Sequence, residues 1–204
     1  GLAAGARRGI LIKGGTYLED ARLLKAVALD KTGTITEGKP KLVKWQVWGA
    51  GEEAAVQQMA ASLAARSDHP VSKAIVQGLD VKGPEAESFK ALPGRGVEGM
   101  VNGVRLMLGN HRLIHEQGLC GPELEAELVI HEKQGRTVTL LADDSGVLAL
   151  FAVADTIRET SKQAIVDLKA LGVTSVMLTG DNTATAKAIA AQAGIDEARG
   201  DLLP

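Results

Sequence analysis

VALDKTGTIT, residues 27–36, joins a short aliphatic run to a polar turn and decides how the rest of the sequence is interpreted. Residues 25–29 form a brief apolar run that stops at a turn-forming cluster, which is typical of a parallel strand buried on both faces. Asp30 follows at the carboxyl end of that strand. In open parallel sheets ligands bind at this edge, because the loops there point backbone N–H groups into a shared crevice. Asp30 is therefore a candidate site residue from its position alone.

A second stretch, VTSVMLTGDN at residues 173–182, repeats the pattern of an aliphatic strand that ends in a polar turn. Apolar residues with helical spacing flank it on both sides: Ala164, Ile165, Leu168 and Leu171 before it, and Ala186, Ile189, Ala190 and Ala193 after it. Helix, strand, helix is the repeat of a doubly wound sheet. We therefore expect an α/β fold with a Rossmann-like parallel sheet.

Residues between these two stretches follow a different pattern. KLVKWQVWG alternates Val43, Trp45 and Val47 inward against Lys44, Gln46 and Trp48, which predicts a strand with one solvated face. A helix follows, with Val56, Met59, Ala60 and Leu63 on its buried side. Asn102-Gly103 lies between two apolar alternations and predicts a hairpin, and strands 137–142 and 147–153 turn at DDSG.

These patterns predict an antiparallel α+β unit that is inserted into the parallel sheet. We assign residues 42–152 to the inserted domain, and residues 1–41 and 153–204 to the two parts of the domain that carries Asp30. An inserted unit of this size is large enough to have its own core.

Composition restricts the class of protein. With 204 residues, 45% hydrophobic content and a net charge of −2, the chain is expected to be globular, with no nucleic-acid partner. The single cysteine, Cys120, cannot form an internal disulfide, is expected to be structural or incidental, and suits a reducing cytosol. No apolar run approaches a membrane span, and no signal peptide is visible. The opening GLAAGARRGILIKGG, with Arg7, Arg8 and Lys13, is either the cytoplasmic stub of a membrane helix or an ordinary amphipathic helix start.

The two strand ends carry the parts of a phosphate site. A carboxylate such as Asp30 attacks phosphorus if the charge of the phosphate is neutralised, and Lys31 supplies a nearby cation. Thr32, Gly33 and Thr34 offer amides and hydroxyls to phosphate oxygens, as do Thr179 and Gly180 in the second turn, which a helix from about Thr183 follows. The plainer alternatives are a strand-end turn aspartate for Asp30 and a helix cap for TGDN.

DKTGT followed far downstream by TGD resembles the P-type ATPases, which are cation pumps of the haloacid dehalogenase superfamily. The resemblance implies that Asp30 takes the γ-phosphate of ATP and forms an aspartyl-phosphate, with Mg²⁺ bridging the carboxylate and the phosphoryl group. It implies a metal-ligand carbonyl at Thr32 and a phosphate-binding hydroxyl at Thr179. The catalytic residues it implies are Asp30, Lys31, Thr32, Thr179, Gly180 and Asp181, with Asp30 and Thr32 as Mg²⁺ ligands of an incomplete site. Phosphatases of the superfamily carry an acid/base aspartate where this chain has Thr32, so the phosphoenzyme is expected to persist.

The inserted unit resembles heavy-metal-transporting P-type ATPases in SDHP, residues 67–70, and GRGVEG, residues 94–99. The resemblance implies that His69 contacts adenine and that Gly94 and Gly96 let the backbone approach the nucleotide. Ser67, Asp68 and, from the weaker LGN match, Gly109 complete the nucleotide-binding set that it implies. The alternative for His69 is a helix cap without a ligand, because Pro70 suits the first position of a helix that Asp68 or His69 caps.

Some features depart from the family pattern or stay open. Ala64 stands where the subfamily usually carries a glutamate that helps to hold adenine. Asp155 and Arg158 in ADTIRETS are either a brace of the crossing between the two domains or an ordinary helix-start pair. His111 and His115 have helical i, i+4 spacing without a third ligand nearby, so they are interpreted as surface residues. The scattered histidines, His131 included, make no metal site with a single cysteine.

The match covers nearly the whole chain, which ends before the lysine and the Gly-Asp-Gly motif that complete the family's phosphorylation site. The resemblance implies a parent protein at the cytoplasmic face of a bacterial inner or plasma membrane. Its partners would be an actuator domain and a transmembrane metal-transport domain. For this chain we expect ATP binding by the inserted domain, with autophosphorylation impaired or absent.

Several functions remain open at this point. General similarity favours a Zn²⁺, Cd²⁺ or Pb²⁺ exporter, with a Cu⁺ exporter as the alternative, since membrane residues outside this chain choose the ion. A soluble phosphatase with a large cap is disfavoured by Thr32. A nucleotide-binding module without turnover is the alternative of another class, and Ala64 favours it for the chain as given.

Overall fold

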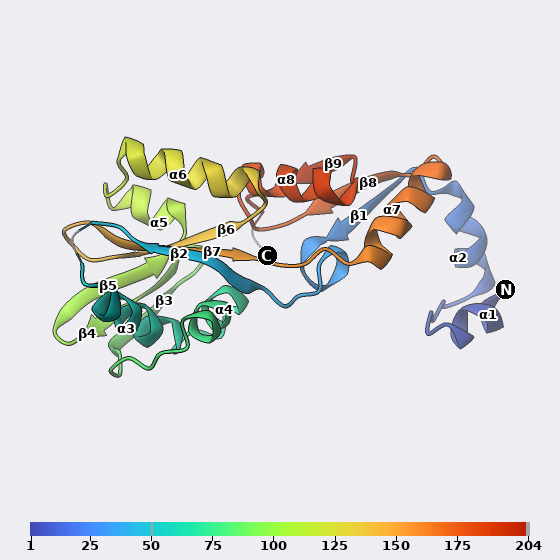
Figure 1. Ribbon diagram of the computed structural model, residues 1–204. Helices are drawn as coiled ribbons and strands as arrows, with labels where there is room; N and C mark the ends of the chain where they lie inside the picture. The colour runs from blue at the N-terminus through green and yellow to red at the C-terminus, as the bar shows by residue number, and fades with distance from the viewer. Residues whose placement is uncertain (50, 203–204) are drawn as a thin grey trace.

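The computed structural model describes residues 1–49 and 51–202, which form two sheets that share no strand. The smaller sheet contains β1 (Ala26–Asp30), β8 (Thr174–Leu178) and β9 (Glu197–Arg199), in the order β1-β8-β9 and all parallel. Two helices, α7 (Glu159–Ala170) and α8 (Thr183–Ala193), flank it (Figure 1). Ile165, Met177 and Ile189 lie in the core between them. The α/β expectation for this part of the chain is confirmed.

The larger sheet is antiparallel, with the strand order β2-β7-β6-β5-β4-β3. Its strands are β2 (Lys41–Val47), β3 (Glu87–Leu92), β4 (Gly96–Val101), β5 (Val104–Gly109), β6 (Thr137–Ala142) and β7 (Val147–Ala154). Helices α3 (Glu53–Ala64) and α4 (Pro70–Leu79) pack on one face, and α5 (His111–Glu116) and α6 (Pro122–Lys133) on the other (Figure 1). Two apolar cores result, one containing Phe151 and the other Leu150.

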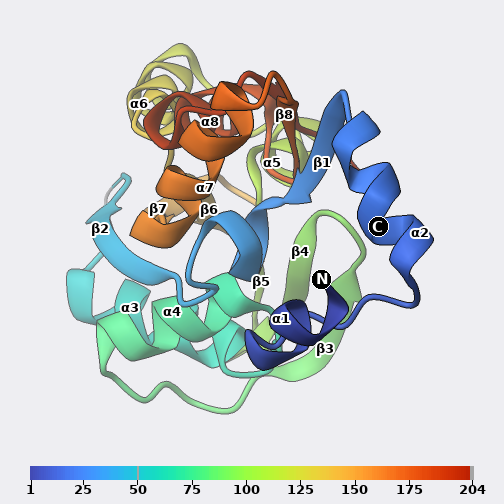
Figure 2. The same ribbon diagram turned by 90° about the vertical axis from the view of Figure 1, so that its right-hand side faces the viewer.

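The N-terminal segment lies at the far side of the parallel sheet from the antiparallel one (Figure 1). It contains α1 (Leu2–Arg7) and α2 (Gly15–Asp20), which Figure 2 labels, and the short η1 (Ala21–Leu23). None of these three elements has a buried residue. Within residues 1–49 and 51–202, no helix combines the length and the apolar character that a membrane crossing needs.

The hairpin between β4 and β5 forms where Asn102-Gly103 predicts it. Both residues have positive φ, 51° and 77°, and Val101 pairs with Val104 across the turn. Consecutive positive φ values define the tight turn whose twist matches that of antiparallel strands, and asparagine and glycine adopt it at low cost. The turn fixes the register between β4 and β5, in which Gly96 pairs with Gly109.

Two strand predictions were wrong in their burial. Exposure alternates along β1, with Ala26 and Ala28 exposed, because β1 is an edge strand of the described sheet and is not covered on both faces. In β2, Val43 is 49% exposed, since the register shifts between Leu42 and Lys44 and Leu42 packs inward in its place. The predicted solvated face of β2 is confirmed only in part, because Lys44 is exposed and Gln46 half-buried, whereas Trp48 follows β2 and packs against the second core. Trp45 and Val47 pack inward as predicted.

The helix predictions hold more closely. Val56, Ala60 and Leu63 of α3 are buried and Met59 packs against the same core, and in α8 all four predicted positions are buried. In α7 only Ile165 is buried and Leu168 is half-buried. Ala164 and Leu171 are exposed, so that only Ile165 and Leu168 of the four predicted positions pack against the core.

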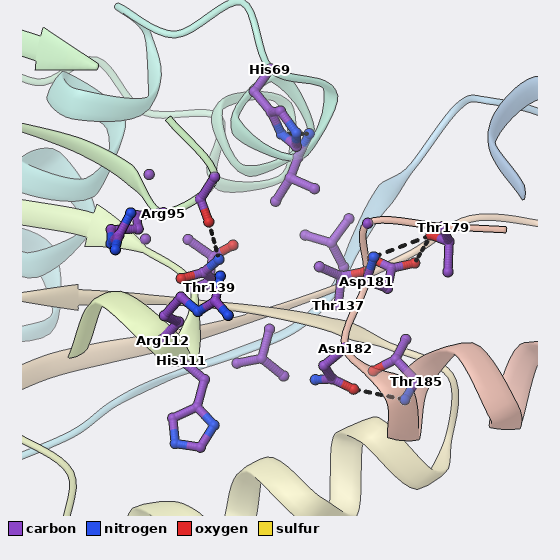
Figure 3. Close-up of a pocket in the computed structure, with 18 of the residues that line it drawn as sticks. His69, Arg95, His111, Arg112, Thr137, Thr139, Thr179, Asp181, Asn182 and Thr185 are labelled. Atoms are coloured by element: carbon purple, nitrogen blue, oxygen red, sulfur yellow. Dashed lines mark hydrogen bonds between the residues drawn. The ribbon is translucent and has the colours of Figure 1, made fainter. Parts of the chain in front are cut away.

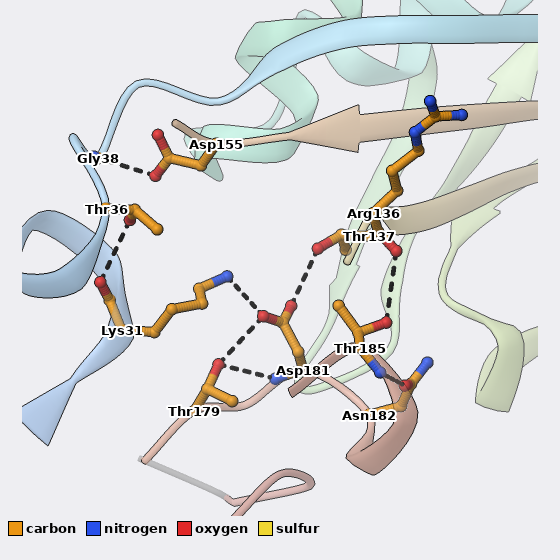
Figure 4. Close-up of polar contacts among 10 residues, drawn as sticks. All are labelled: Lys31, Thr36, Gly38, Arg136, Thr137, Asp155, Thr179, Asp181, Asn182 and Thr185. Atoms are coloured by element: carbon orange, nitrogen blue, oxygen red, sulfur yellow. Dashed lines mark hydrogen bonds and ion pairs between the residues drawn. The ribbon is translucent and has the colours of Figure 1, made fainter. Parts of the chain in front are cut away.

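The two crossings between the sheets run side by side and are tied together. Asp155 accepts hydrogen bonds from the backbone N–H groups of Gly38 and Lys39, at 3.0 and 3.1 Å. The Arg158 guanidinium donates from Nε to the Thr36 carbonyl at 3.0 Å, and Thr36 bridges to Ile157 (Figure 4 shows the Asp155 contact). Of the two readings of Asp155 and Arg158, the brace of the crossing is therefore confirmed.

Candidate functional site

A cleft of about 1320 Å³ lies where residues of both sheets meet (Figure 3). Ten of the twelve residues that the sequence nominates line it: Lys31, Thr32, Ser67, His69, Gly94, Gly96, Gly109, Thr179, Gly180 and Asp181. Asp30 and Asp68 are not among the lining residues. The cleft thus unites both predicted constellations although they belong to different sheets.

The floor of the cleft at the parallel sheet is a hydrogen-bonded group around Asp181 (Figure 4). Lys31 Nζ lies 2.5 Å from Asp181 Oδ2, and Thr179 Oγ1 donates to the same oxygen at 3.1 Å. Their chain segments meet because β1 and β8 pair in parallel, so that the turns after Asp30 and Leu178 start at the same edge. The side chains of Lys31 and Asp181 are only 13% and 11% exposed, so solvent screens this pair little.

Thr137 is a member of this group that sequence reasoning missed. Its hydroxyl donates to Asp181 Oδ1 at 3.0 Å, and it belongs to β6 of the antiparallel sheet. One carboxylate therefore ties the two sheets together. A single threonine at the start of an ordinary strand gives no local signal of this contact, which depends on how the sheets are placed.

The N-terminus of α8 points into the same cleft. Asn182 is its cap residue, and Asn182 Oδ1 accepts from the backbone N–H of Thr185 at 2.8 Å (Figure 3). The amide of Asn182 also donates to Glu132 of α6 at 2.6 Å, and burial raises the pKa of Glu132. The expected helix from Thr183 is confirmed, with a positive end that favours anions at the cleft.

Asp30 lies beside this group at the carboxyl end of β1, opposite Leu178. It is exposed, and within the described residues no side-chain hydrogen bond or ion pair engages its carboxylate. In the turn η2 (Lys31–Ile35) that follows, Gly33 has a φ of 77°, a conformation that glycine adopts without strain. Asp30 is therefore a free carboxylate beside a paired lysine.

The donor set of Asp30 and Thr32 fits Mg²⁺. A carboxylate and a backbone carbonyl are hard oxygen ligands, and Mg²⁺ is usually held by one or two carboxylates together with waters and substrate phosphates. Asp181 is already occupied by Lys31, Thr137 and Thr179. The chain would thus hold the ion through Asp30 and Thr32.

His69 marks the opposite wall of the cleft at the start of α4 (Figure 3). Its Nδ1 accepts a hydrogen bond from the backbone N–H of Val71 at 3.3 Å. Of the two cap residues that the sequence allowed, Asp68 and His69, it is therefore His69 that caps the helix beginning at Pro70. Desolvation is the main cause that lowers the pKa of His69. The carboxylate of Asp181 acts to raise this pKa, and the ammonium of Lys31 acts to lower it further. The ring is therefore neutral at pH 7, with Nδ1 engaged and the Nε2–H left to donate.

The glycine loop has its own internal reasons for glycine. Gly94 adopts a φ of 68°, and Asn110 Nδ2 donates to the Gly94 carbonyl at 2.9 Å. Gly96 has a φ of 148°, and a Cβ there would lie 2.3 Å from the Leu108 carbonyl oxygen and 2.4 Å from the Gly109 Cα. Backbone packing against β5 thus excludes a side chain at Gly96, whether or not a nucleotide also approaches there.

Gly96→Ala is expected to destabilise the chain by about 2–3 kcal/mol, since it combines overpacking with a backbone conformation reserved for glycine. Gly103→Ala is the matched control: its φ is also positive, 77°, but nothing lies within 4 Å of its Cβ position. That variant should lose only about 1–2 kcal/mol. Urea unfolding of both variants measures the difference, and equal losses would contradict the packing explanation.

Asp68, which was predicted as a nucleotide contact, and Ala64, which stands where the subfamily usually carries a glutamate, both lie outside the lining of the cleft. The fully exposed carboxylate of Asp68 lies 3.3 Å from Lys73 Nζ. Ala64, the last residue of α3, is 1% exposed in the first core. Asn110, which the sequence left in the weak LGN match, caps α5 and holds the glycine loop.

The fold and this cleft define a class of protein. Residues 24–204 match the model of the haloacid dehalogenase-like hydrolases, and the chain belongs to that family. Its relatives are heavy-metal P-type ATPases, in agreement with the resemblance seen in the sequence. The chain is 39% identical over 207 residues to a copper-exporting P-type ATPase of Bacillus subtilis, covering 100% of this chain and 26% of the relative. It is 37% identical over 208 residues to a probable cadmium-transporting ATPase of Staphylococcus aureus, covering 98% and 26%.

Solved structures agree. The crystal structure of a zinc-transporting PIB-type ATPase in the E2.Pi state is 40% identical, with a TM-score of 0.67, covering 100% of this chain and 33% of that one. The catalytic domain of the CPx-ATPase CopB-B shares the fold at 22% identity, with a TM-score of 0.69, covering 98% and 70%. The chain spans about a quarter of the length of the curated relatives that it matches.

Proposed function

We propose that this chain is the ATP-binding and phosphoryl-accepting part of a heavy-metal cation pump, with Asp30 as the phosphoryl acceptor. The observation that carries the proposal is the single cleft that His69 and the glycine loop share with Lys31, Thr179 and the N-terminus of α8. A nucleotide with its base at one wall and its phosphates at the other would use both constellations. The residue divisions 1–41, 42–152 and 153–204 then correspond to a phosphorylation domain split by a nucleotide-binding domain.

The wall at α4 suits adenine. The neutral His69 ring offers one N–H donor and a flat face, and its position is fixed because Nδ1 caps the helix. Gly94 brings bare backbone to the same wall, and Asn110 holds that loop in place. Ala64 lies outside the cleft, so recognition here rests on His69 and the loop rather than on a carboxylate.

The opposite wall suits a triphosphate. Lys31, the Gly180 amide and the N-terminus of α8 place positive charge and N–H donors at the edge where Asp30 stands. In the reaction we propose, a carboxylate oxygen of Asp30 bonds to the γ-phosphorus while the bond from that phosphorus to the β–γ bridging oxygen breaks. ADP leaves with the electron pair, and an acyl phosphate remains. Mg²⁺, when bound, supplies charge neutralisation between the carboxylate and the phosphate oxygens.

The persistence of that acyl phosphate follows from Thr32. Its side chain is no general base, so the chain offers no carboxylate two residues after Asp30 to activate water. This favours a pump over a soluble phosphatase. In this proposal the chain lies at the cytoplasmic face of the membrane. Its partners are the transmembrane metal-transport domain and the actuator domain of the same pump. The metals of the relatives are mixed, so the preference for Zn²⁺, Cd²⁺ or Pb²⁺ stays a prediction.

His69→Asn is expected to weaken ATP binding about tenfold, which corresponds to the loss of one hydrogen bond and the ring contact. Asparagine keeps the helix cap, because it is among the best cap residues, so the variant removes the imidazole without unravelling α4. Isothermal calorimetry of the chain with ATP, ADP and AMP, with and without Mg²⁺, measures the effect. Because ATP, ADP and AMP carry the same adenine, the substitution should weaken the binding of all three by a similar factor.

Asp68→Asn is the matched control, since it changes the neighbouring residue outside the cleft. It should bind ATP within about twofold of the parent sequence, as expected of an exposed surface substitution. Absence of nucleotide binding by the parent sequence would overturn the proposal. Equal losses for both variants would show that the start of α4 acts through its fold rather than through His69.

A further inference from the structure

Four side chains with metal-binding atoms converge between α5 and α6. They are His111, His115, Cys120 and Glu125, and their ligand atoms all lie within 4.8 Å of one another. The sequence had predicted no third ligand near the two histidines, and this prediction was wrong. The reason is tertiary: the loop after α5 turns the chain back, so that Cys120 and the first turn of α6 face the histidines.

The contacts inside this cluster, which we call the His-Cys-Glu cluster, are already close. His111 Nε2 lies 2.8 Å from Glu125 Oε1. The rings of His111 and His115 meet edge to face with centroids 6.0 Å apart, as their spacing on α5 dictates. Burial, and then the carboxylate of Glu125, raise the pKa of the Cys120 thiol. Cys120 and Leu119 pack against the second core, which anchors the loop.

The donor set selects a class of metal. Two imidazoles, one sulfur and one carboxylate oxygen are the ligand types of tetrahedral zinc sites, whereas Mg²⁺ and Ca²⁺ take oxygen ligands. Atoms about 2.0–2.3 Å from one ion lie at most about 4.6 Å apart, so small side-chain rotations close the cluster around an ion. A thiolate and a carboxylate also balance the charge of a divalent ion.

We propose that the His-Cys-Glu cluster is a binding site for a divalent transition metal of the Zn²⁺ class. It differs from the Asp30 and Thr32 donors, which lie at the end of β1 and in the turn that follows and suit Mg²⁺. His111, His115 and Glu125 also line the proposed nucleotide cleft, whereas Cys120 is not among its lining residues. Metal binding would clamp α5 to α6, and α5 is capped by Asn110, the residue that holds Gly94. The site does not depend on the proposed nucleotide function.

Titration of the chain with Co²⁺ tests this site, because Co²⁺ reports its own ligands. We expect one equivalent to give the intense visible bands of a tetrahedral ion together with a thiolate-to-cobalt charge-transfer band, both removed by Zn²⁺. Cys120 is the single cysteine of the chain, so that band assigns the site. Cys120→Ser should abolish the charge-transfer band. Glu125→Gln and His115→Gln should each weaken binding at least about tenfold, since even outer-sphere partners are worth about 10–100-fold.

Glu123→Gln is the matched control, because Glu123 is exposed on the first turn of α6 and stands outside the cluster. It should bind Co²⁺ as the parent sequence does. A second readout needs no variant at Cys120: Zn²⁺, but not Mg²⁺, should protect the thiol from alkylation, and His115→Gln should remove that protection. A Co²⁺ complex without a thiolate band, or a thiol that Zn²⁺ leaves fully reactive, would overturn the proposal.

Discussion

Asp30→Asn is expected to abolish every acid-stable phosphoryl label that the chain acquires from ATP labelled at the γ-phosphate. The carboxylate of Asp30 is exposed and engaged by no side chain of the described structure, and it stands beside Lys31 at the edge that the cleft opens on. An amide has no anionic oxygen with which to attack phosphorus. An acyl phosphate also has a chemical signature, because hydroxylamine cleaves it while leaving phosphoserine and phosphothreonine intact.

The experiment compares the parent sequence, Asp30→Asn and Asp68→Asn after acid quenching, with and without hydroxylamine. Asp68→Asn is the control for the loss of an exposed carboxylate outside the cleft, and it should retain whatever label the parent sequence acquires. Since the exposed Asp30 side chain makes no hydrogen bond or ion pair in the described structure, its variant should keep its stability within about 0.5 kcal/mol. Label that persists in Asp30→Asn, or that hydroxylamine does not release, would place the acceptor elsewhere.

Asp181→Ala is expected to destabilise the chain by about 3 kcal/mol, the low end of the cost of removing one partner of a buried ion pair, because this pair is part-buried at the cleft. The substitution leaves the Lys31 ammonium, only 13% exposed, without its partner at 2.5 Å. It also removes the acceptor of the Thr137 and Thr179 hydroxyls. Because Thr137 belongs to β6, the loss affects the junction of the two sheets as well as the parallel sheet. In a chain of this size the melting temperature should fall by roughly 6 °C or more.

Lys31→Met should cost less than Asp181→Ala, about 1–3 kcal/mol, because the Asp181 carboxylate keeps two hydroxyl donors. The double variant should then be more stable than the sum of the single losses predicts, with a coupling of about 1–3 kcal/mol between the two side chains. Thermal unfolding of the four proteins without nucleotide measures this cycle. If the two losses in the free energy of unfolding simply add in the double variant, the Lys31–Asp181 ion pair contributes no coupling energy.

Much of this protein was determined by local sequence patterns. The Asn102-Gly103 turn was predictable because few residues other than asparagine and glycine adopt consecutive positive φ values at low cost. The helix start at Pro70 and the two polar turns after β1 and β8 were predictable for a similar reason, since caps and strand ends depend on a few neighbouring residues. The motif residues of the candidate site belong to such local features.

Only the tertiary structure decided which of these features meet. The Thr137 contact with Asp181, the burial of Ala64 and the exposure of Val43 depend on sheet placement, on core packing and on a register shift. For the His-Cys-Glu cluster the sequence showed only the i, i+4 spacing of His111 and His115, because no periodicity describes the path of the loop that brings Cys120 and Glu125 to them. The physical reason is the range of the interactions: dihedral preferences and caps act within one turn of chain, whereas ligand sets and buried ion pairs join segments that packing brings together.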